Sequence, residues 1–257
     1  MYYYILEQQK NKNSESLVNK IIASIEDLQI MGEAVKANPI QKPDELAEIG
    51  LSKGYNTVVA VGSDSIINEI APIVAKHSAV LGIIPTDPNS SFFNLIDCST
   101  WNQAISILAK RITNEFDLGV LGKEKVFLSH LSVRPKKNNA ASVKVIFDKY
   151  EVEAPIEEVI VGNSYYKDEK WAKYGFSDNL VSIYLKSKEA QKNSGFFKNL
   201  FSAPKTSFTS VFHAHTCHLG GLEKTLSVFS SDNQFICHTP IHVSVIPKAI
   251  KLIVGKK

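Results

Sequence analysis

Residues 55–70 read YNTVVAVGSDSIINEI, and the hydrophobic pattern changes in the middle of this stretch. The β-branched run at 58–61 is typical of a buried strand and stops at Gly62. Three small polar residues follow, and isoleucines between Ile66 and Ile70 then recur at helical spacing. The stretch therefore predicts a strand, a tight turn and the start of a helix.

The predicted turn offers two features that suit an anionic ligand. Backbone N–H groups at the start of a helix have no intrahelical partners, and the helix dipole adds partial positive charge there. Together they form a favourable position for a phosphate group. An ordinary strand-to-helix connection with Asp64 or Ser65 as N-cap explains the same residues. This stretch by itself leaves both interpretations open.

A second buried strand and polar turn follow at residues 79–94, which read AVLGIIPTDPNSSFFN. Ends of neighbouring parallel strands form the ligand crevice of open α/β sheets. The two turns together resemble those of the diacylglycerol and sphingosine kinase superfamily, which is related to the NAD kinases. In that family the first turn reads Gly-Gly-Asp-Gly-Thr before an Asn-Glu pair, and a Leu-Gly-Ile-Ile-Pro strand precedes a Gly-Thr-Gly-Asn-Asp-Phe turn. Asn68, Glu69, Leu81–Pro85 and Phe92 match this pattern here.

The resemblance implies ATP and Mg²⁺ as cofactors and a nucleotide site at the two turns. Its cofactor-binding residues would be Gly62, Ser63, Asp64, Ser65, Asn68, Glu69, Thr86, Asn89 and Ser90. Two family glycines are replaced by serines, whose Cβ atoms strain positions that favour φ > 0 and crowd an approaching phosphate. The serine hydroxyls can donate hydrogen bonds in compensation. The turn after the first strand has also lost its family signature and reads EQQKNK at 7–12.

The resemblance also places acidic residues in the second half of the chain. Asp178 stands where the family has the first carboxylate of a metal-binding turn, and it is the expected metal ligand here. Near the C-terminus the family carries Asp-Gly-Glu, whose glutamate deprotonates the lipid hydroxyl, whereas this chain reads Asp232-Asn233-Gln234. A glutamine amide accepts no titratable proton, so general-base catalysis is absent at that position. The catalytic candidates are thus Asp64, Asp178, Asp232 and Gln234.

The chain of 257 residues, 44% hydrophobic and 21% charged, suits one large or two modest domains with real cores. Alternating strand and helix patterns predict an α/β domain at 1–119 with a parallel, doubly wound sheet. Its first helix is expected from Leu17, after a polar loop at 8–16. Short strand patterns separated by turn residues predict an antiparallel, sandwich-like β domain at 120–257. The predicted strands lie at 125–133, 142–148, 157–161, 180–186, 206–214, 224–229 and 241–254. We expect the last strand to pack back towards the first domain.

Net charge and hydropathy limit which partners and which cellular compartment we expect. A net charge of +3 gives no argument for nucleic acid as a partner. Three widely spaced cysteines are typical of reduced thiols, and no apolar run approaches the roughly 18 residues of a membrane span. We therefore expect a cytoplasmic protein, at most peripheral at the membrane. The oligomeric state is left open.

Two further segments invite functional interpretations. His213, His215 and Cys217 alternate along a predicted strand and would share one face, so they suit a metal, although strand histidines are more often structural. Residues 194–205 read SGFFKNLFSAPK, a basic amphipathic pattern that suits a lipid or membrane surface. The alternative for that segment is a helix packed on the β domain.

These patterns predict a lipid-kinase fold with eroded phosphate turns. The activity implied by the resemblance is ATP-dependent phosphoryl transfer to a diacylglycerol-like lipid hydroxyl, which we expect to be weak or lost. A non-catalytic nucleotide-binding or scaffold protein is the alternative from another class, and an NAD kinase is a third.

Overall fold

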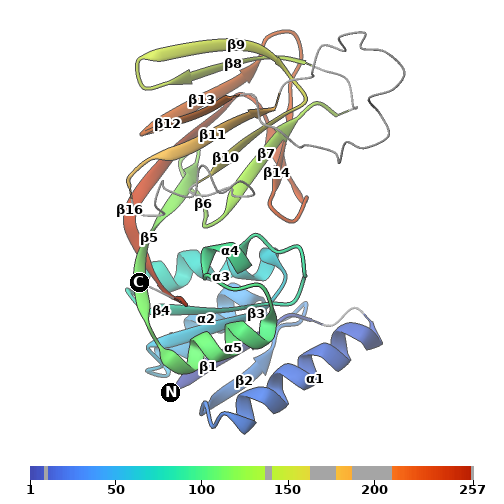
Figure 1. Cartoon of the computed structure of the whole chain (residues 1–257), viewed down its shortest axis with the longest axis vertical. Coiled ribbons are helices and arrows are strands. Elements are labelled where there is room, and N and C mark those ends of the chain that lie inside the picture. Colours follow the sequence, from blue (N-terminus) through green and yellow to red (C-terminus); the bar gives the residue numbers. More distant parts are fainter. Residues whose placement is uncertain (9–10, 137–140, 163–177, 187–209, 256–257) are drawn as a thin grey trace, which may run out of the picture.

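The computed structural model describes residues 1–8, 11–136, 141–162, 178–186 and 210–255 of the chain. Strands and helices alternate in the N-terminal half, as the hydrophobic pattern predicts, and the C-terminal half is built from strands (Figure 1). The N-terminal elements are β1 (Tyr2–Leu6), α1 (Lys12–Asp27), β2 (Gly32–Lys36), α2 (Pro43–Ser52), β3 (Thr57–Gly62), α3 (Asp64–Lys76), β4 (Val80–Pro85), α4 (Phe92–Leu95) and α5 (Trp101–Lys110).

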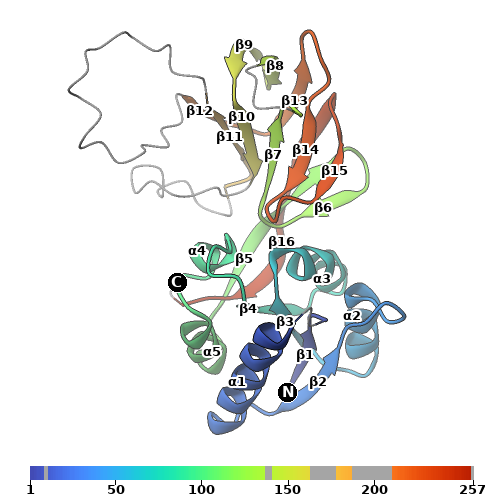
Figure 2. The same ribbon diagram turned by 90° about the vertical axis from the view of Figure 1, so that its right-hand side faces the viewer.

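The first four strands lie parallel in the order β2-β1-β3-β4. Helices α1 and α5 cover one face of this sheet, and α2 and α3 cover the other (Figure 2). The predicted doubly wound parallel sheet is therefore confirmed. The direction of winding reverses between β1 and β3, so the carboxyl ends of these two strands flank the crevice where such folds bind ligands.

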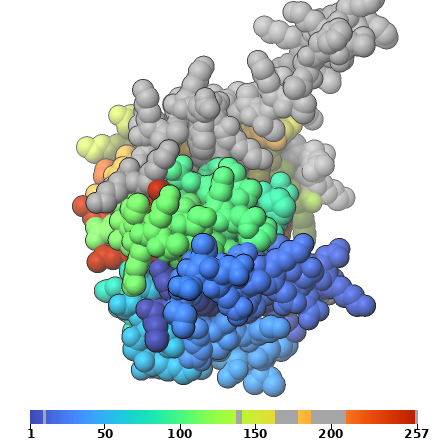
Figure 3. Space-filling view, turned by 60° about the horizontal axis from the view of Figure 1, so that its bottom comes forward, coloured from blue at the N-terminus to red at the C-terminus, as the bar shows by residue number. Residues whose placement is uncertain are grey.

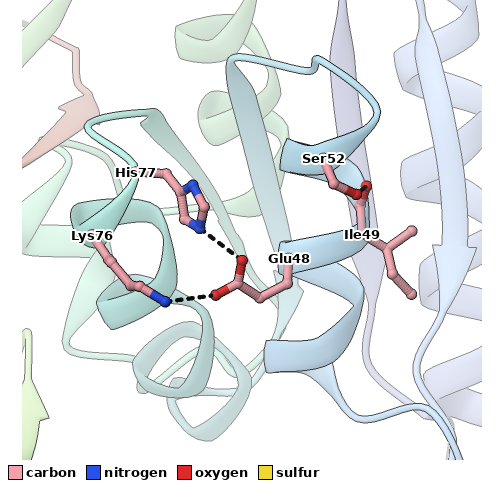
Figure 4. Close-up of polar contacts among 5 residues, drawn as sticks. All are labelled: Glu48, Ile49, Ser52, Lys76 and His77. Carbon is pink, nitrogen blue, oxygen red and sulfur yellow. Dashed lines mark hydrogen bonds and ion pairs between the residues drawn. The ribbon is translucent and has the colours of Figure 1, made fainter.

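On each face of the sheet the two covering helices contact each other. In the space-filling view, α1 in blue and α5 in green lie side by side on one face (Figure 3). On the other face, the Glu48 carboxylate of α2 lies 2.7 Å from Nε2 of His77 and accepts a hydrogen bond from Nζ of Lys76 over 3.4 Å (Figure 4). The hydrogen bond from His77 is the main reason that the pKa of Glu48 is lowered. These contacts hold the C-terminal end of α3 against α2.

The C-terminal half contains β5 (Thr113–Leu121), β6 (Lys125–Phe127), β7 (His130–Arg134), β8 (Ala141–Phe147), β9 (Tyr150–Ile156), β10 (Glu158–Gly162), β11 (Val181–Lys186), β12 (Ser210–Ala214), β13 (Thr216–Gly221), β14 (Ser227–Ser230), β15 (Phe235–His238) and β16 (Ile241–Ile253). One antiparallel sheet has the order β12-β11-β10-β7-β14-β15. Its buried side chains share a core with those of β8, β13 and the first part of β16, so the antiparallel β-sandwich-like prediction is confirmed.

The long strands β5 and β16 join the two halves. They pair with each other along most of their length, and β16 also pairs with β13 near its start and in parallel with β4 near its end (Figure 2). The parallel sheet thus continues into the β-rich half through β16. The predicted domain boundary near residue 120 falls at the end of β5. It stays a prediction.

The structure corrects several predicted elements. The first helix begins at Lys12 instead of Leu17, because Asn11 caps it: the Asn11 side chain accepts the Ser14 N–H over 2.9 Å, and the Ser14 hydroxyl accepts the Asn11 N–H. Strands β5, β9, β13 and β15 and the short helix α4 were absent from the sequence-based prediction. The predicted strand at 125–133 is interrupted between β6 and β7.

Candidate active site

A crevice of about 240 Å³ opens at the carboxyl ends of β1 and β2 beside the first turn of α3. Its lining residues are Glu7, Gln8, Ala37, Asn38, Pro39, Pro43, Ser65, Ile66 and Glu69. Glu7 after β1 and Ser65 after β3 bring it to the point where the winding of the sheet reverses, which is the ligand position of doubly wound folds. Ser65, Ile66 and Glu69 of the first predicted turn line it, and Gln234 of the β-rich half donates a hydrogen bond to Ser65 at its edge.

The first turn, between β3 and α3, is short, and the side-chain carboxylate of Glu7 accepts hydrogen bonds from it. Ser63 is the N-cap of α3, and its side chain makes no capping hydrogen bond within the helix. Instead, its backbone N–H donates to Oε2 of Glu7 over 2.6 Å, and its hydroxyl donates to Oε1 of Glu7 over 2.8 Å. The carboxylate of Glu7 therefore stands against the backbone N–H at the entrance to α3.

Gly62 allows this approach. A Cβ atom at residue 62 would lie 2.6 Å from both Cβ and Oε2 of Glu7, and 2.8 Å from Cγ2 of Ile66. Any larger residue would push Glu7 away from Ser63. The glycine at the end of β3 is thus explained by the internal carboxylate that packs over it.

Asp64 is buried at the start of α3 and connects the two predicted turns. The Ser90 hydroxyl donates to Oδ1 of Asp64, and Ser91 donates to Oδ2 from its hydroxyl over 2.8 Å and from its N–H over 3.3 Å. The Ser91 hydroxyl lies 2.6 Å from that of Ser129, in the β-rich half. Both carboxylate oxygens of Asp64 are therefore engaged by serines of the second turn.

Asn68, one turn further along α3, also bridges the two halves. Its Nδ2 donates to the backbone carbonyl of Asp64 over 2.9 Å, and its Oδ1 accepts the backbone N–H of Leu128 over 3.1 Å. Leu128 lies between β6 and β7. The retained asparagine of the first motif thus ties α3 to the β-rich half.

A chain of polar contacts runs from Glu69 to the hairpin between β14 and β15. The Ser65 hydroxyl donates to Oε1 of Glu69 over 3.1 Å, and Nε2 of Gln234 donates to Oγ of Ser65 over 3.1 Å. Burial raises the pKa of Glu69; the hydrogen bond from Ser65 opposes this effect, and the charges of Asp44, Glu7 and Asp232 add to it. Two acidic side chains, Glu7 and Glu69, therefore line the crevice.

The remaining predicted residues of the turns lie at different depths. The Thr86 N–H donates to the Gly62 carbonyl over 3.0 Å, which holds the end of β4 beside the end of β3. Asn89 is exposed, and its backbone N–H donates to Oδ1 of Asp87. Asp232, on the hairpin, accepts a hydrogen bond from the Ser230 hydroxyl.

Asp178 lies in another environment, near Asp117 and His213. Burial raises its pKa; the N–H of Leu180 opposes this effect, and the charge of Asp117 adds to it. In the part of the chain that the structure describes, no three or more histidine, cysteine or acidic side chains are arranged to hold a metal ion. The role of Asp178 as metal ligand stays a prediction.

Asp117 is a structural carboxylate that the sequence did not single out as a site residue. It is 1% exposed, and its oxygens accept the N–H of Asn179 over 2.8 Å and that of Lys248 over 2.7 Å. Both partners have positive φ, +64° for Asn179 and +49° for Lys248. Asp117 therefore stabilises two backbone positions with positive φ, one just before β11 and one in the irregular part of β16.

The expected metal face of His213, His215 and Cys217 is not formed, because these residues do not share one strand. His213 lies in β12 opposite Ser182 of β11, whereas Cys217 is buried in β13 of the other sheet. The chain bends at His215, where the Asp148 carboxylate accepts the N–H groups of His215 and Thr216. The alternation in sequence spans this bend, so it does not report a common face.

The amphipathic segment 194–205 lies outside the described residues, so its predicted contact with a lipid or membrane surface remains untested. None of the helices in the described ranges is long and apolar enough to cross a membrane.

No protein-family model matches the sequence, and no curated protein matches it. The structure is nevertheless similar to solved structures of proteins from Bacillus anthracis strain Sterne. One, described as a diacylglycerol kinase, superposes with a TM-score of 0.75 at 15% identity over 99% of this chain and 96% of that chain. Two described as candidate diacylglycerol kinases give TM-scores of 0.78 and 0.74 at 15% and 16% identity, over 99% of this chain and 97% of each. The chain thus has a diacylglycerol-kinase-like fold over nearly its whole length.

Proposed function

We propose that this chain is a lipid-kinase-fold protein in which ATP-dependent phosphoryl transfer to a diacylglycerol-like lipid hydroxyl is weak or lost. The proposal rests on Asp64, the acidic residue that the resemblance places at the catalytic turn. Both of its carboxylate oxygens accept hydrogen bonds from Ser90 and Ser91. A carboxylate used in this way cross-links the two turns and has little capacity left to bind a metal or position a nucleophile.

Gln234 supports the same conclusion. It stands where the resembled family has the glutamate that deprotonates the acceptor, and its amide donates to Ser65 beside the crevice. A neutral amide at this position cannot act as general base. General-base assistance is worth about 10²- to 10⁴-fold in rate, so its loss slows transfer without by itself abolishing it.

ATP and Mg²⁺ do not fit the described crevice. The N–H that would face a phosphate already binds the carboxylate of Glu7, and Glu69 lines the same space. The described residues also contain no cluster of three metal-ligating side chains.

The decisive experiment measures transfer of radiolabelled γ-phosphate from MgATP to diacylglycerol in mixed micelles. The proposal predicts that wild-type protein stays near background and that Asp64→Asn is indistinguishable from it. A bacterial diacylglycerol kinase run in parallel shows that the assay works. Robust transfer by the wild type that disappears in a folded Asp64→Asn variant would contradict the proposal.

A second candidate is a purely non-catalytic binding or scaffold protein with the same fold. The negative charge of Glu7 and Glu69 in the crevice favours it, because it opposes a triphosphate. Thermal melts against MgATP distinguish weak from absent nucleotide binding: a shift abolished in Asp64→Ala indicates a surviving nucleotide site and residual kinase character, whereas no shift in either protein favours scaffolding. Adding NAD as an acceptor to the transfer assay tests the NAD kinase alternative.

A further inference from the structure

We infer that Glu7 is a specificity-determining residue that takes the place of a ligand phosphate at the N-terminus of α3. This inference rests on the proposed function and explains why the crevice excludes triphosphates. Its basis is the pair of hydrogen bonds by which the Glu7 carboxylate engages Ser63, one from the backbone N–H over 2.6 Å and one from the hydroxyl over 2.8 Å. A carboxylate held in this way reproduces the contacts that two phosphate oxygens make at such a turn.

The backbone holds Glu7 at this point. Its own N–H donates to the Val61 carbonyl over 2.9 Å, which extends the pairing of β1 with β3 by one residue. On the other side, the N–H of Ala37 donates to the carbonyl of Leu6 over 2.9 Å. Glu7 thus leaves β1 between its two neighbours, directly at the reversal of winding.

The side chain of Glu7 fills the space above Gly62. Gly62 presents no Cβ, and one placed there would lie 2.6 Å from both Cβ and Oε2 of Glu7. The room that a glycine provides for the close approach of a phosphate is here taken up by the side chain of Glu7. A phosphate could reach the N–H of Ser63 only after this side chain had moved away.

The other acid at this turn does not compete for the same donors. Asp64 directs its carboxylate to Ser90 and Ser91 of the second turn. Asp64 therefore joins the two turns to each other, whereas Glu7 accepts the hydrogen bonds of the donors at the start of α3. Glu69 lines the same crevice, with Asp44 and Asp232 close enough to raise its pKa, so that a triphosphate meets acidic side chains as well as an occupied position.

The test is isothermal titration of inorganic tripolyphosphate, and separately of MgATP, into wild-type protein and three full-length variants. Glu7→Ala opens the turn, and Glu7→Gln keeps the shape of the side chain without its charge. Glu15→Ala is the control, because it removes one exposed acid of α1 that lines the neighbouring surface hollow and not this turn.

We expect Glu7→Ala to bind tripolyphosphate at least tenfold more tightly than the wild type, Glu7→Gln to lie between them, and Glu15→Ala to match the wild type. Equal affinity of the wild type and both Glu7 variants overturns the inference, and so does an equal gain in Glu15→Ala, which would reflect net charge alone. Should Glu7→Ala not fold, the comparison of Glu7→Gln with Glu15→Ala decides.

Tripolyphosphate binding tests the role of Glu7, whereas phosphoryl transfer to lipid tests the proposed function. Tighter tripolyphosphate binding by Glu7→Ala, together with background lipid phosphorylation by the wild type, supports both the inference and the proposed function. Phosphoryl transfer by the wild type contradicts the proposed function whatever the binding results. Unchanged binding in the Glu7 variants with background transfer overturns the role of Glu7 alone.

Discussion

The side-chain amide of Gln234 donates a hydrogen bond to the hydroxyl of Ser65 over 3.1 Å and so connects the β14–β15 hairpin to the first turn of α3. The single hydroxyl proton of Ser65 is already directed at Glu69, so only a donor suits residue 234. Gln234→Glu replaces this donor with a second acceptor and adds a charge near Glu69 and Asp232. We expect it to lower the free energy of unfolding at pH 7 by about 1 kcal/mol, whereas Gln234→Ala costs less because it adds no charge.

Urea unfolding of both variants against the wild type measures this difference. A Gln234→Glu protein as stable as Gln234→Ala would mean that the hairpin does not hold its acceptor close to Ser65 and Glu69 in solution. The lipid phosphorylation assay on Gln234→Glu is a useful companion, because restoring the carboxylate should not restore transfer while Asp64 stays bound to the second turn.

Truncation of Asp64 should destabilise the fold strongly. Asp64→Ala leaves the buried hydroxyl of Ser90 and the half-buried N–H of Ser91 without their acceptor, and an unsatisfied buried donor costs about 1–3 kcal/mol. We expect a loss of about 2–4 kcal/mol in urea unfolding, with a smaller loss for Asp64→Asn, whose amide oxygen can still accept one bond.

Asp87→Ala is the matched control for Asp64. It removes an exposed acid from the same second turn, where Asp87 accepts the N–H of Asn89. Its expected cost is below about 1 kcal/mol, in line with exposed positions. If the two variants lost equal stability, Asp64 could not be the cross-link between the turns.

Asn68 offers a local test of how the two halves are connected. In Asn68→Ala the N–H of Leu128 loses its acceptor, and α3 loses one side-chain bond to its own backbone. We expect a loss of about 1–3 kcal/mol. Hydrogen exchange measured by NMR should show the Leu128 amide losing protection well beyond the global change, while amides in the centre of β3 follow global stability.

General destabilisation would instead accelerate exchange at Leu128 and in β3 by the same factor. That outcome would mean that the contact between Asn68 and Leu128 does not exist in solution.

The sequence predicted the N-terminal half well because its signals are local. The apolar run at 58–61 and the helical spacing from Ile66 to Ile70 are each explained by neighbours along the chain, and the structure places β3 and α3 there. Strand β5 was missed because it contains Asp117 and Gly119, residues of low strand propensity. Asp117 is tolerated because distant backbone N–H groups bind it, and Gly119 because the ring of Phe127 packs against it.

The same distinction applies to the candidate site. The motifs located both turns and the bridging residues Asp64 and Asn68. They did not indicate Glu7, whose partner Ser63 is 56 residues away in the sequence. The sequence recorded only that the turn after β1 had lost its family signature. Which side chain had replaced the phosphate followed from the pairing of β1 with β3 and from the space above Gly62.

Glu69 should make stability depend on pH. Burial, together with the charges of Asp44, Glu7 and Asp232, raises its pKa above the ordinary value of 4.5. The folded chain therefore holds this proton more tightly than the unfolded chain, so the stability from Glu69 is fully present below pH 4.5 and is lost as the pH rises through the raised pKa. Glu69→Gln removes this loss, and its amide oxygen can still accept the hydroxyl of Ser65. We expect the variant to be more stable than the wild type at pH 7 by a few tenths of a kcal/mol, since the side chain is partly exposed.

Below pH 4.5 that advantage should vanish, because the protonated glutamic acid is then as neutral as glutamine. Urea unfolding at pH 4 and pH 7 gives both differences, and Glu15→Gln, on the exposed surface of α1, provides the control that changes charge without changing the crevice. An advantage of Glu69→Gln that is equal at both pH values would show that repulsion among the crevice carboxylates is not its cause. A pH-dependent advantage would instead confirm that this crevice carries, in the folded chain, the negative charge that opposes a triphosphate.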